Sequence, residues 1–83
     1  MNFVFSAKAS REFKKLDRTA QIRIFATLKR YTQKESPLRF AEKLTDRRFG
    51  AWRFRVGDYR LLCDIENQTI VIVKVGHRRD IYR

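Results

Sequence analysis

The chain has 83 residues, and its 20 lysines and arginines against nine acidic residues give a net charge of +11. This length predicts a single domain over residues 1–83. The apolar share of 43% and the charged share of 35% exclude a disordered chain. So large a basic excess is typical of a nucleic-acid-binding protein, although an anionic membrane or an acidic protein would also complement it.

One cysteine, Cys63, and one histidine predict neither an internal disulfide nor a four-ligand zinc site. No apolar run approaches the roughly 20 residues that span a bilayer. The first ten residues, MNFVFSAKAS, lack the pattern of a signal peptide. We therefore expect a soluble, cytoplasmic protein with no metal, no cofactor and no membrane partner.

The first half of the chain predicts one strand and then a helical hairpin. Residues 2–5 are aromatic-rich and predict the strand, while Ser6 and Asp17 are suitable N-caps for two helices. Apolar residues at helical spacing give each helix one buried stripe: Ala9, Phe13 and Leu16 in the first, then Ile22, Ile24, Phe25, Leu28 and Tyr31 in the second. Pro37 ends the second helix. A further helical turn is predicted around Phe40, Ala41 and Leu44.

The second half is organised around a β-hairpin over residues 52–65. Gly57-Asp58 favours a two-residue turn, which would set Arg55 opposite Arg60. Cross-strand partners share a face, so one face is apolar and predicts the core: Trp52, Phe54, Val56, Tyr59, Leu61, Cys63 and Ile65. The other carries Arg53, Arg55 and Arg60, and we call it the arginine face. Directly opposed like charges destabilise a sheet, so this face is expected to bind an anion.

A β-branched strand follows a turn at Asn67-Gln68. Simple register divides it between the core face, with Ile70 and Ile72, and the arginine face, with Val71, Val73, Val75 and His77. That register also places Lys74 in the core. Three alternatives are open: a shifted register, a β-bulge, or a lysine that extends to the sheet edge.

Together these elements predict an α+β fold, with the N-terminal strand and the helical hairpin packed on one face of a small antiparallel β-sheet. The helices can cover only one face. Leu62, Val71 and Val73 remain on the other face, and we expect a partner protein to cover part of it.

The segments WRFRVGDYRLL and KVGHRRDIY, placed after a helical hairpin, resemble the RelE/ParE superfamily of bacterial and archaeal toxins, and its RelE branch in particular. The resemblance covers essentially the whole chain. It implies a RelE-like fold and a toxin of a type II toxin–antitoxin system that cleaves messenger RNA in the ribosomal A site. It further implies metal-independent attack by the 2′-hydroxyl on the adjacent phosphate, and a cognate antitoxin that silences the toxin.

The resemblance also assigns roles to the basic residues. Arg60 and Arg78 would stabilise the phosphate and the transition state, Arg53 would orient the RNA backbone, and Tyr82 would stack on or position the nucleotide. Arg55 belongs to this catalytic set, but it stands where better-known RelE members carry lysine, and arginine stays protonated. Arg79 and Lys74 would add RNA contacts.

Proton transfer has no single assigned residue. His77 is either a general acid or base or a structural donor, because an unperturbed imidazole titrates at about pH 6.5. Two other functions stay open, a ParE-like DNA gyrase inhibitor of the same fold and a catalytically weak RNA-binding relative. The arginine face favours the ribonuclease, since a pure binder needs no clustered phosphate donors on one sheet face.

Overall fold

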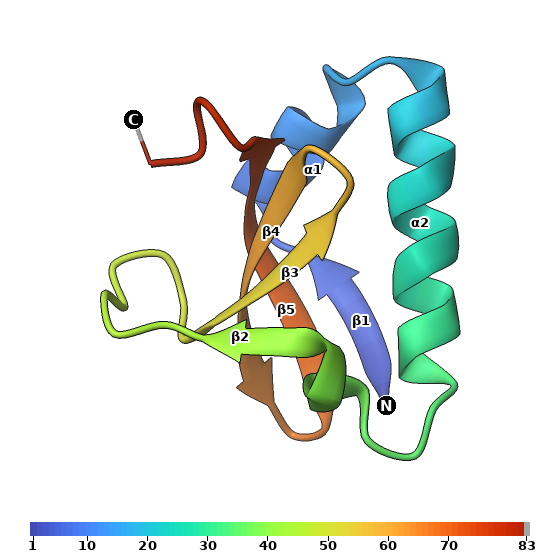
Figure 1. The fold of residues 1–83 in the computed structure, drawn as a ribbon, viewed down its shortest axis with the longest axis vertical. Helices are drawn as coiled ribbons and strands as arrows, with labels where there is room; N and C mark the ends of the chain where they lie inside the picture. The colour runs from blue at the N-terminus through green and yellow to red at the C-terminus, as the bar shows by residue number, and fades with distance from the viewer. Residues whose placement is uncertain (83) are drawn as a thin grey trace.

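The computed structural model describes residues 1–82 and has the predicted α+β fold (Figure 1). Five strands form one sheet in the order β1-β5-β4-β3-β2. Their bounds are Asn2–Phe5 for β1, Ala41–Lys43 for β2, Trp52–Val56 for β3, Tyr59–Glu66 for β4 and Thr69–His77 for β5. The helices are α1, Ala7–Lys14, and α2, Arg18–Thr32, with a 3-10 turn η1 at Pro37–Phe40. Because β1 runs parallel to β5 and the other pairs are antiparallel, the sheet is mixed rather than purely antiparallel.

Both predicted helix caps are confirmed. The hydroxyl of Ser6 accepts a hydrogen bond from the backbone N–H of Ala9 at 3.1 Å, and the Asp17 carboxylate accepts one from Ala20 at 2.7 Å. These bonds satisfy donors that the first turn of a helix leaves without an intrahelical partner. The sequence therefore fixes where α1 and α2 begin.

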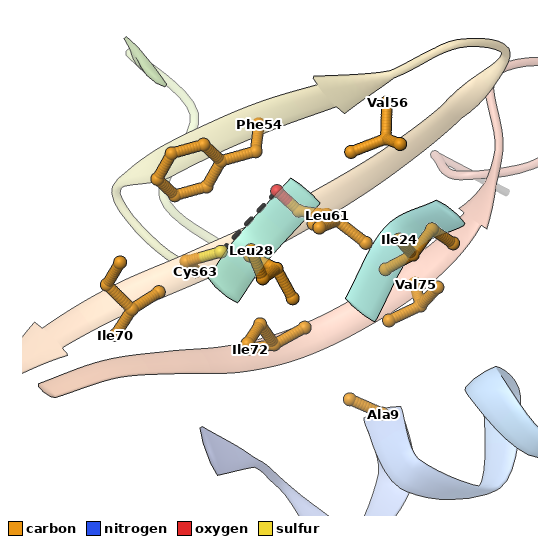
Figure 2. Close-up of a cluster of buried hydrophobic side chains, with 10 residues drawn as sticks. All are labelled: Ala9, Ile24, Leu28, Phe54, Val56, Leu61, Cys63, Ile70, Ile72 and Val75. Carbon is orange, nitrogen blue, oxygen red and sulfur yellow. Dashed lines mark hydrogen bonds between the residues drawn. The ribbon is translucent and has the colours of Figure 1, made fainter. Parts of the chain in front are cut away.

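A single apolar layer holds the helices on one face of the sheet (Figure 2). It consists of Ala9 from α1, Ile24 and Leu28 from α2, and Phe54, Val56, Leu61, Cys63, Ile70, Ile72 and Val75 from the three central strands. Burial of each large side chain stabilises the fold by about 1.5–3 kcal/mol. The Cys63 S–H donates to the Leu61 carbonyl at 3.6 Å, and burial raises the pKa of the thiol. Cys63 is thus the small buried hydrophobe that the sequence predicts.

Two residues of α2 lie outside this layer. The side chains of Ile22 and Phe25 are 60% and 50% exposed, so their predicted place in the buried stripe is wrong. Successive helical residues are about 100° apart. Ile22 therefore lies roughly 200° from the buried Ile24, on the side of α2 that faces away from the sheet.

The hairpin register is confirmed at all five pairs, including Arg55 opposite Arg60. The next turn is also as predicted, with positive φ at Asn67 and Gln68. Between β4 and β5 the structure selects the bulge from the three alternatives, because Leu62 pairs with Lys74 whereas Cys63 pairs with Ile72. Val73 is the extra residue.

The bulge reverses the predicted faces of everything that follows it in β5. Val75 pairs with Leu61 and is buried in the core, and His77 pairs with Tyr59. Their predicted place on the arginine face is therefore wrong. Lys74 moves to the arginine face opposite Leu62 instead.

Residues 37–43 differ from the prediction as well. The helical turn forms earlier, at Pro37–Phe40, and Ala41–Lys43 becomes the edge strand β2. An edge strand presents unpaired backbone donors and acceptors, and β2 satisfies those of β3 from Trp52 to Phe54. This pairing carries Glu42 onto the arginine face opposite Arg53.

The chain itself covers much of the arginine face. Leu62 is buried, and Val71 and Val73 are half-buried. Ile81 is 1% exposed and lies against Gly76, while the loop after β2 places Phe49 over Lys74 at 4.0 Å from the amine to the ring centroid. Leu62 therefore needs no partner to bury it, whereas Val71 and Val73 keep part of their surface exposed. Neither α1 nor α2 is long and apolar enough to cross a membrane.

Candidate functional site

The arginine face forms as predicted, with Arg53 and Arg55 on β3 and Arg60 on β4. Arg55 has 58% of its side chain exposed, whereas Arg53 has 19%. Arg60 donates through one Nη to the carbonyls of Gly57 and Tyr59 at 2.9 and 3.0 Å, which holds its guanidinium at the hairpin turn. Three guanidiniums thus occupy one end of the sheet.

Glu42 joins these arginines, although no pattern in the sequence predicts it there. Its carboxylate accepts a hydrogen bond from Arg53 Nη2 at 2.7 Å and pairs with Arg55 Nε at 2.7 Å. The hydrogen bond from Arg53 lowers the pKa of Glu42, and the charges of Arg53, Arg55 and Arg60 lower it further. Glu42 is therefore ionised at neutral pH. The position of Glu42 depends on the pairing of β2 with β3, which no local sequence pattern predicts.

Tyr82 lies in the same cluster. Its hydroxyl accepts a hydrogen bond from Arg53 Nη1 at 2.5 Å, while the residue remains 51% exposed. A turn places it there, since the backbone N–H groups of Asp80 and Ile81 both donate to the His77 carbonyl and Ile81 is buried. The exposed phenol of Tyr82 is suited to stack on a base. The guanidinium of Arg53, which this hydrogen bond holds in place, is suited to bind a phosphate.

His77 and Arg78 lie at the end of β5, beside the β3–β4 hairpin turn. Arg78 is anchored to the hairpin turn, because its backbone N–H donates to the Asp58 carbonyl at 2.7 Å and its Nε lies 3.7 Å from the Asp58 carboxylate. His77 Nδ1 accepts from the backbone N–H of Arg79 at 3.2 Å. A neutral ring that accepts at Nδ1 carries its proton on Nε2. The His77 ring also contacts the Tyr59 ring, with 5.8 Å between centroids.

Lys74 and Arg79, the two predicted RNA contacts, differ in how accessible they are. Lys74 is only 6% exposed beneath Phe49, so it is not an open contact for RNA. Arg79 is exposed. Within residues 1–82 the structure shows no group of three acidic, histidine or cysteine side chains that could hold a metal ion.

Comparison with known proteins agrees with this architecture. Residues 3–82 match the family described as "ParE toxin of type II toxin-antitoxin system, parDE". The chain belongs to the RelE/ParE superfamily of type II toxins. Over 49 residues it is 47% identical to the toxin RelG of Mycobacterium tuberculosis, in a match that spans 57% of this chain and 56% of the relative. The chain thus matches just over half the length of that relative.

Two solved structures share the fold. A chain of the RelBE2 toxin–antitoxin complex of Mycobacterium tuberculosis is 31% identical, with a TM-score of 0.73 over 93% of this chain and 96% of that one. A chain of the RelB–RelE antitoxin–toxin complex of Methanococcus jannaschii also has a TM-score of 0.73, at 22% identity, over 95% and 94% of the two chains. The RelE-like fold predicted from the sequence is therefore confirmed.

Proposed function

We propose that this toxin is a ribosome-dependent endoribonuclease that cleaves messenger RNA in the A site without a metal ion. The observation that carries the proposal is the cluster of Arg53, Arg55 and Arg60 around one carboxylate and one phenol on an accessible part of the sheet. Cleavage within RNA requires stabilisation of a phosphorane-like transition state, and oriented guanidiniums supply it. The site works where ribosomes are, in the cytoplasm.

The proposed reaction balances as an internal transesterification. The 2′-oxygen forms a bond to phosphorus while the bond from phosphorus to the 5′-oxygen breaks, leaving a cyclic phosphate and a 5′-hydroxyl. Arg60 and Arg78 bind the phosphate oxygens. Arg53 and Arg55 orient the RNA strand, and Tyr82 positions the nucleotide. The clustered positive charge offsets the negative charge that develops on the phosphate.

Two proton transfers accompany these steps. Glu42 is the proposed base for the 2′-hydroxyl, because its carboxylate is ionised and lies between Arg53 and Arg55. His77 is not assigned as the acid for the 5′-oxygen, because its ring lies off the arginine face against Tyr59 and its Nδ1 accepts a hydrogen bond from the Arg79 N–H. A neutral ring of this kind could donate only by leaving an imidazolate, so the 5′-oxygen takes its proton from water. Arg55 stays protonated and takes neither role.

The test is primer extension on a messenger RNA in a translating extract, with wild type, Arg60→Ala and Arg11→Ala. Arg11 is an exposed residue of α1, away from the cluster, and is the matched control. We expect cuts within codons that require ribosomes, disappear with Arg60→Ala and persist with Arg11→Ala. Intact RNA together with blocked DNA supercoiling by gyrase would instead identify a ParE-like binder, and intact RNA that is still bound would identify a catalytically weak relative.

A cognate antitoxin is the second part of the proposal. An apolar groove of about 460 Å³ runs beside α1 and α2, where Phe13, Ile22 and Phe25 form its apolar wall. Arg18 and Lys29 also line it. An acidic amphipathic helix would complement both the apolar side chains and these two cations. The two solved relatives are toxin–antitoxin complexes, which supports an antitoxin as the occupant.

Direct binding measurements test this assignment. The cognate antitoxin is expected to bind wild type, and Phe25→Asp is expected to weaken that binding by at least tenfold. Arg39→Asp, an exposed site on η1 outside the groove, is the matched control and should bind as wild type does. Equal loss in both variants would show that net charge, not the groove, determines antitoxin binding.

A further inference from the structure

A second group of arginines lies between α2 and the tip of the β3–β4 hairpin. There a polar hollow of about 300 Å³ is lined by Arg23 and Arg30 of α2 and by Arg55 and Gly57 of the hairpin. Residues four and seven positions apart lie on one side of a helix, so Arg23, Thr27 and Arg30 face the hairpin together. No acidic residue lines the hollow.

The hollow is built by close contacts. Gly57 has φ of +59°, and a Cβ added to it would lie 2.5 Å from Arg23 Nη1. The Arg23 guanidinium therefore rests directly on the backbone of the turn. Arg30 lies over the Tyr31 ring at 5.5 Å, and Tyr31 is itself stacked on Phe40 at 4.4 Å. Both guanidiniums are positioned by neighbours that carry no negative charge.

Two of these three cations lack a counter-charge among the described residues. Within residues 1–82, neither Arg23 nor Arg30 makes an ion pair, and Arg55 uses only Nε to bind Glu42. Like charges held around a common space repel one another, and a bound anion removes that repulsion. A water molecule occupies about 30 Å³, so the hollow accommodates a phosphate with part of its hydration shell.

We propose that this hollow binds a phosphate of an RNA backbone, as a site distinct from the cluster around Glu42. Arg55 belongs to both places, because β2 pairs with β3 only from Trp52 to Phe54 and leaves the edge beside Arg55 uncovered. An RNA strand that crosses the arginine face can thus pass over the uncovered edge of β3 toward α2. Continuity with the arginine face through Arg55 favours RNA over an acidic protein segment, because the proposed substrate lies on that face. In this respect, and for the source of the RNA, messenger or ribosomal, the inference rests on the proposed function.

The experiment compares Arg23→Gln/Arg30→Gln with Arg11→Gln/Arg39→Gln, which removes two exposed charges elsewhere. Binding of a fluorescent 2′-O-methyl RNA oligomer is measured by anisotropy over a range of salt, because this RNA cannot be cleaved by 2′-hydroxyl attack. The hollow variant is expected to lose affinity roughly tenfold. Its slope of log affinity against log salt should fall by about 0.7, the value for one phosphate of a single strand. The Arg11→Gln/Arg39→Gln control should change the affinity and the salt slope less than the hollow variant does. Thermal unfolding checks that both double variants fold.

Co-sedimentation with ribosomes separates the two sources. Loss of oligomer binding supports the messenger backbone, whereas loss of ribosome binding alone supports ribosomal RNA. Equal effects of the two double variants in both assays would overturn the inference, as would loss of antitoxin binding with RNA binding intact. Failure of the proposed function can be distinguished from failure of this inference. In that case wild type would cleave no messenger RNA, yet it would still bind the oligomer in a way that depends on Arg23 and Arg30.

Discussion

Substitution of Ile81 by alanine should separate the stability of the fold from the assembly of its site. Ile81 is 1% exposed, lies against Gly76 and immediately precedes Tyr82. The change removes three carbon groups, and at about 0.8 kcal/mol for each the lost burial is about 2.4 kcal/mol. An unfilled cavity would add to this, but a turn near the chain end can collapse into the space.

The same free energy holds the turn on the sheet. A loss of about 2.4 kcal/mol raises the open population of the turn by roughly 60-fold, since each 1.4 kcal/mol is tenfold. We expect faster hydrogen exchange at the amides of Asp80 and Ile81, whose bonds to the His77 carbonyl close the turn. Cleavage should fall as well, because an open turn releases the Tyr82 hydroxyl from Arg53.

Ile22→Ala is the matched control, with the same chemical change at a side chain that is 60% exposed. Urea denaturation should show a cost within about 0.5 kcal/mol for this variant, against about 2–3 kcal/mol for Ile81→Ala. Similar costs at the two positions, or unchanged exchange at Ile81→Ala, would refute the role assigned to the buried isoleucine.

Three shorter predictions concern titration, thiol chemistry and a turn. Because the Arg53 hydrogen bond lowers the pKa of Glu42, the rate of cleavage should not titrate with Glu42 between pH 6 and 8, and Glu42→Gln should abolish cleavage; cleavage that survives in Glu42→Gln contradicts the assignment of the base. Cys63 is buried and its thiol pKa is raised, so a thiol reagent should modify it only after urea unfolds the protein. Gln68→Gly should stabilise the fold by about 0.5–1 kcal/mol, because φ is +59° there, and Glu66→Gly outside the turn should not.

The sequence predicts best those features that depend on a few adjacent residues. Ser6 and Asp17 set the helix starts because each cap bonds a backbone group three positions ahead. Gly57-Asp58 sets the register of five strand pairs because a two-residue turn leaves no freedom in the pairing. The arginine face follows from that register and from the alternation of side chains along a strand.

Features that depend on distant pairing were missed or misplaced. The bulge at Val73 arises where β5 must bury Ile72 and Val75 in one core, and no turn residue marks it. One extra residue there moves Lys74 out of the core and His77 off the arginine face. Glu42 was missed for the same reason, because a helical turn and a short edge strand are equally compatible with the residues around Ala41.

Contacts between segments far apart in the chain distinguish this cluster from a solvated face. Arg53 and Arg55 alone are two cations on a strand, and alternation alone makes them a solvated face. Glu42 pairs with both, and Tyr82 meets Arg53 from the other end of the chain. A merely solvated face needs neither contact. These two long-range contacts, of which the sequence predicted only that of Tyr82, therefore provide the strongest structural support for the proposed reaction at this end of the sheet.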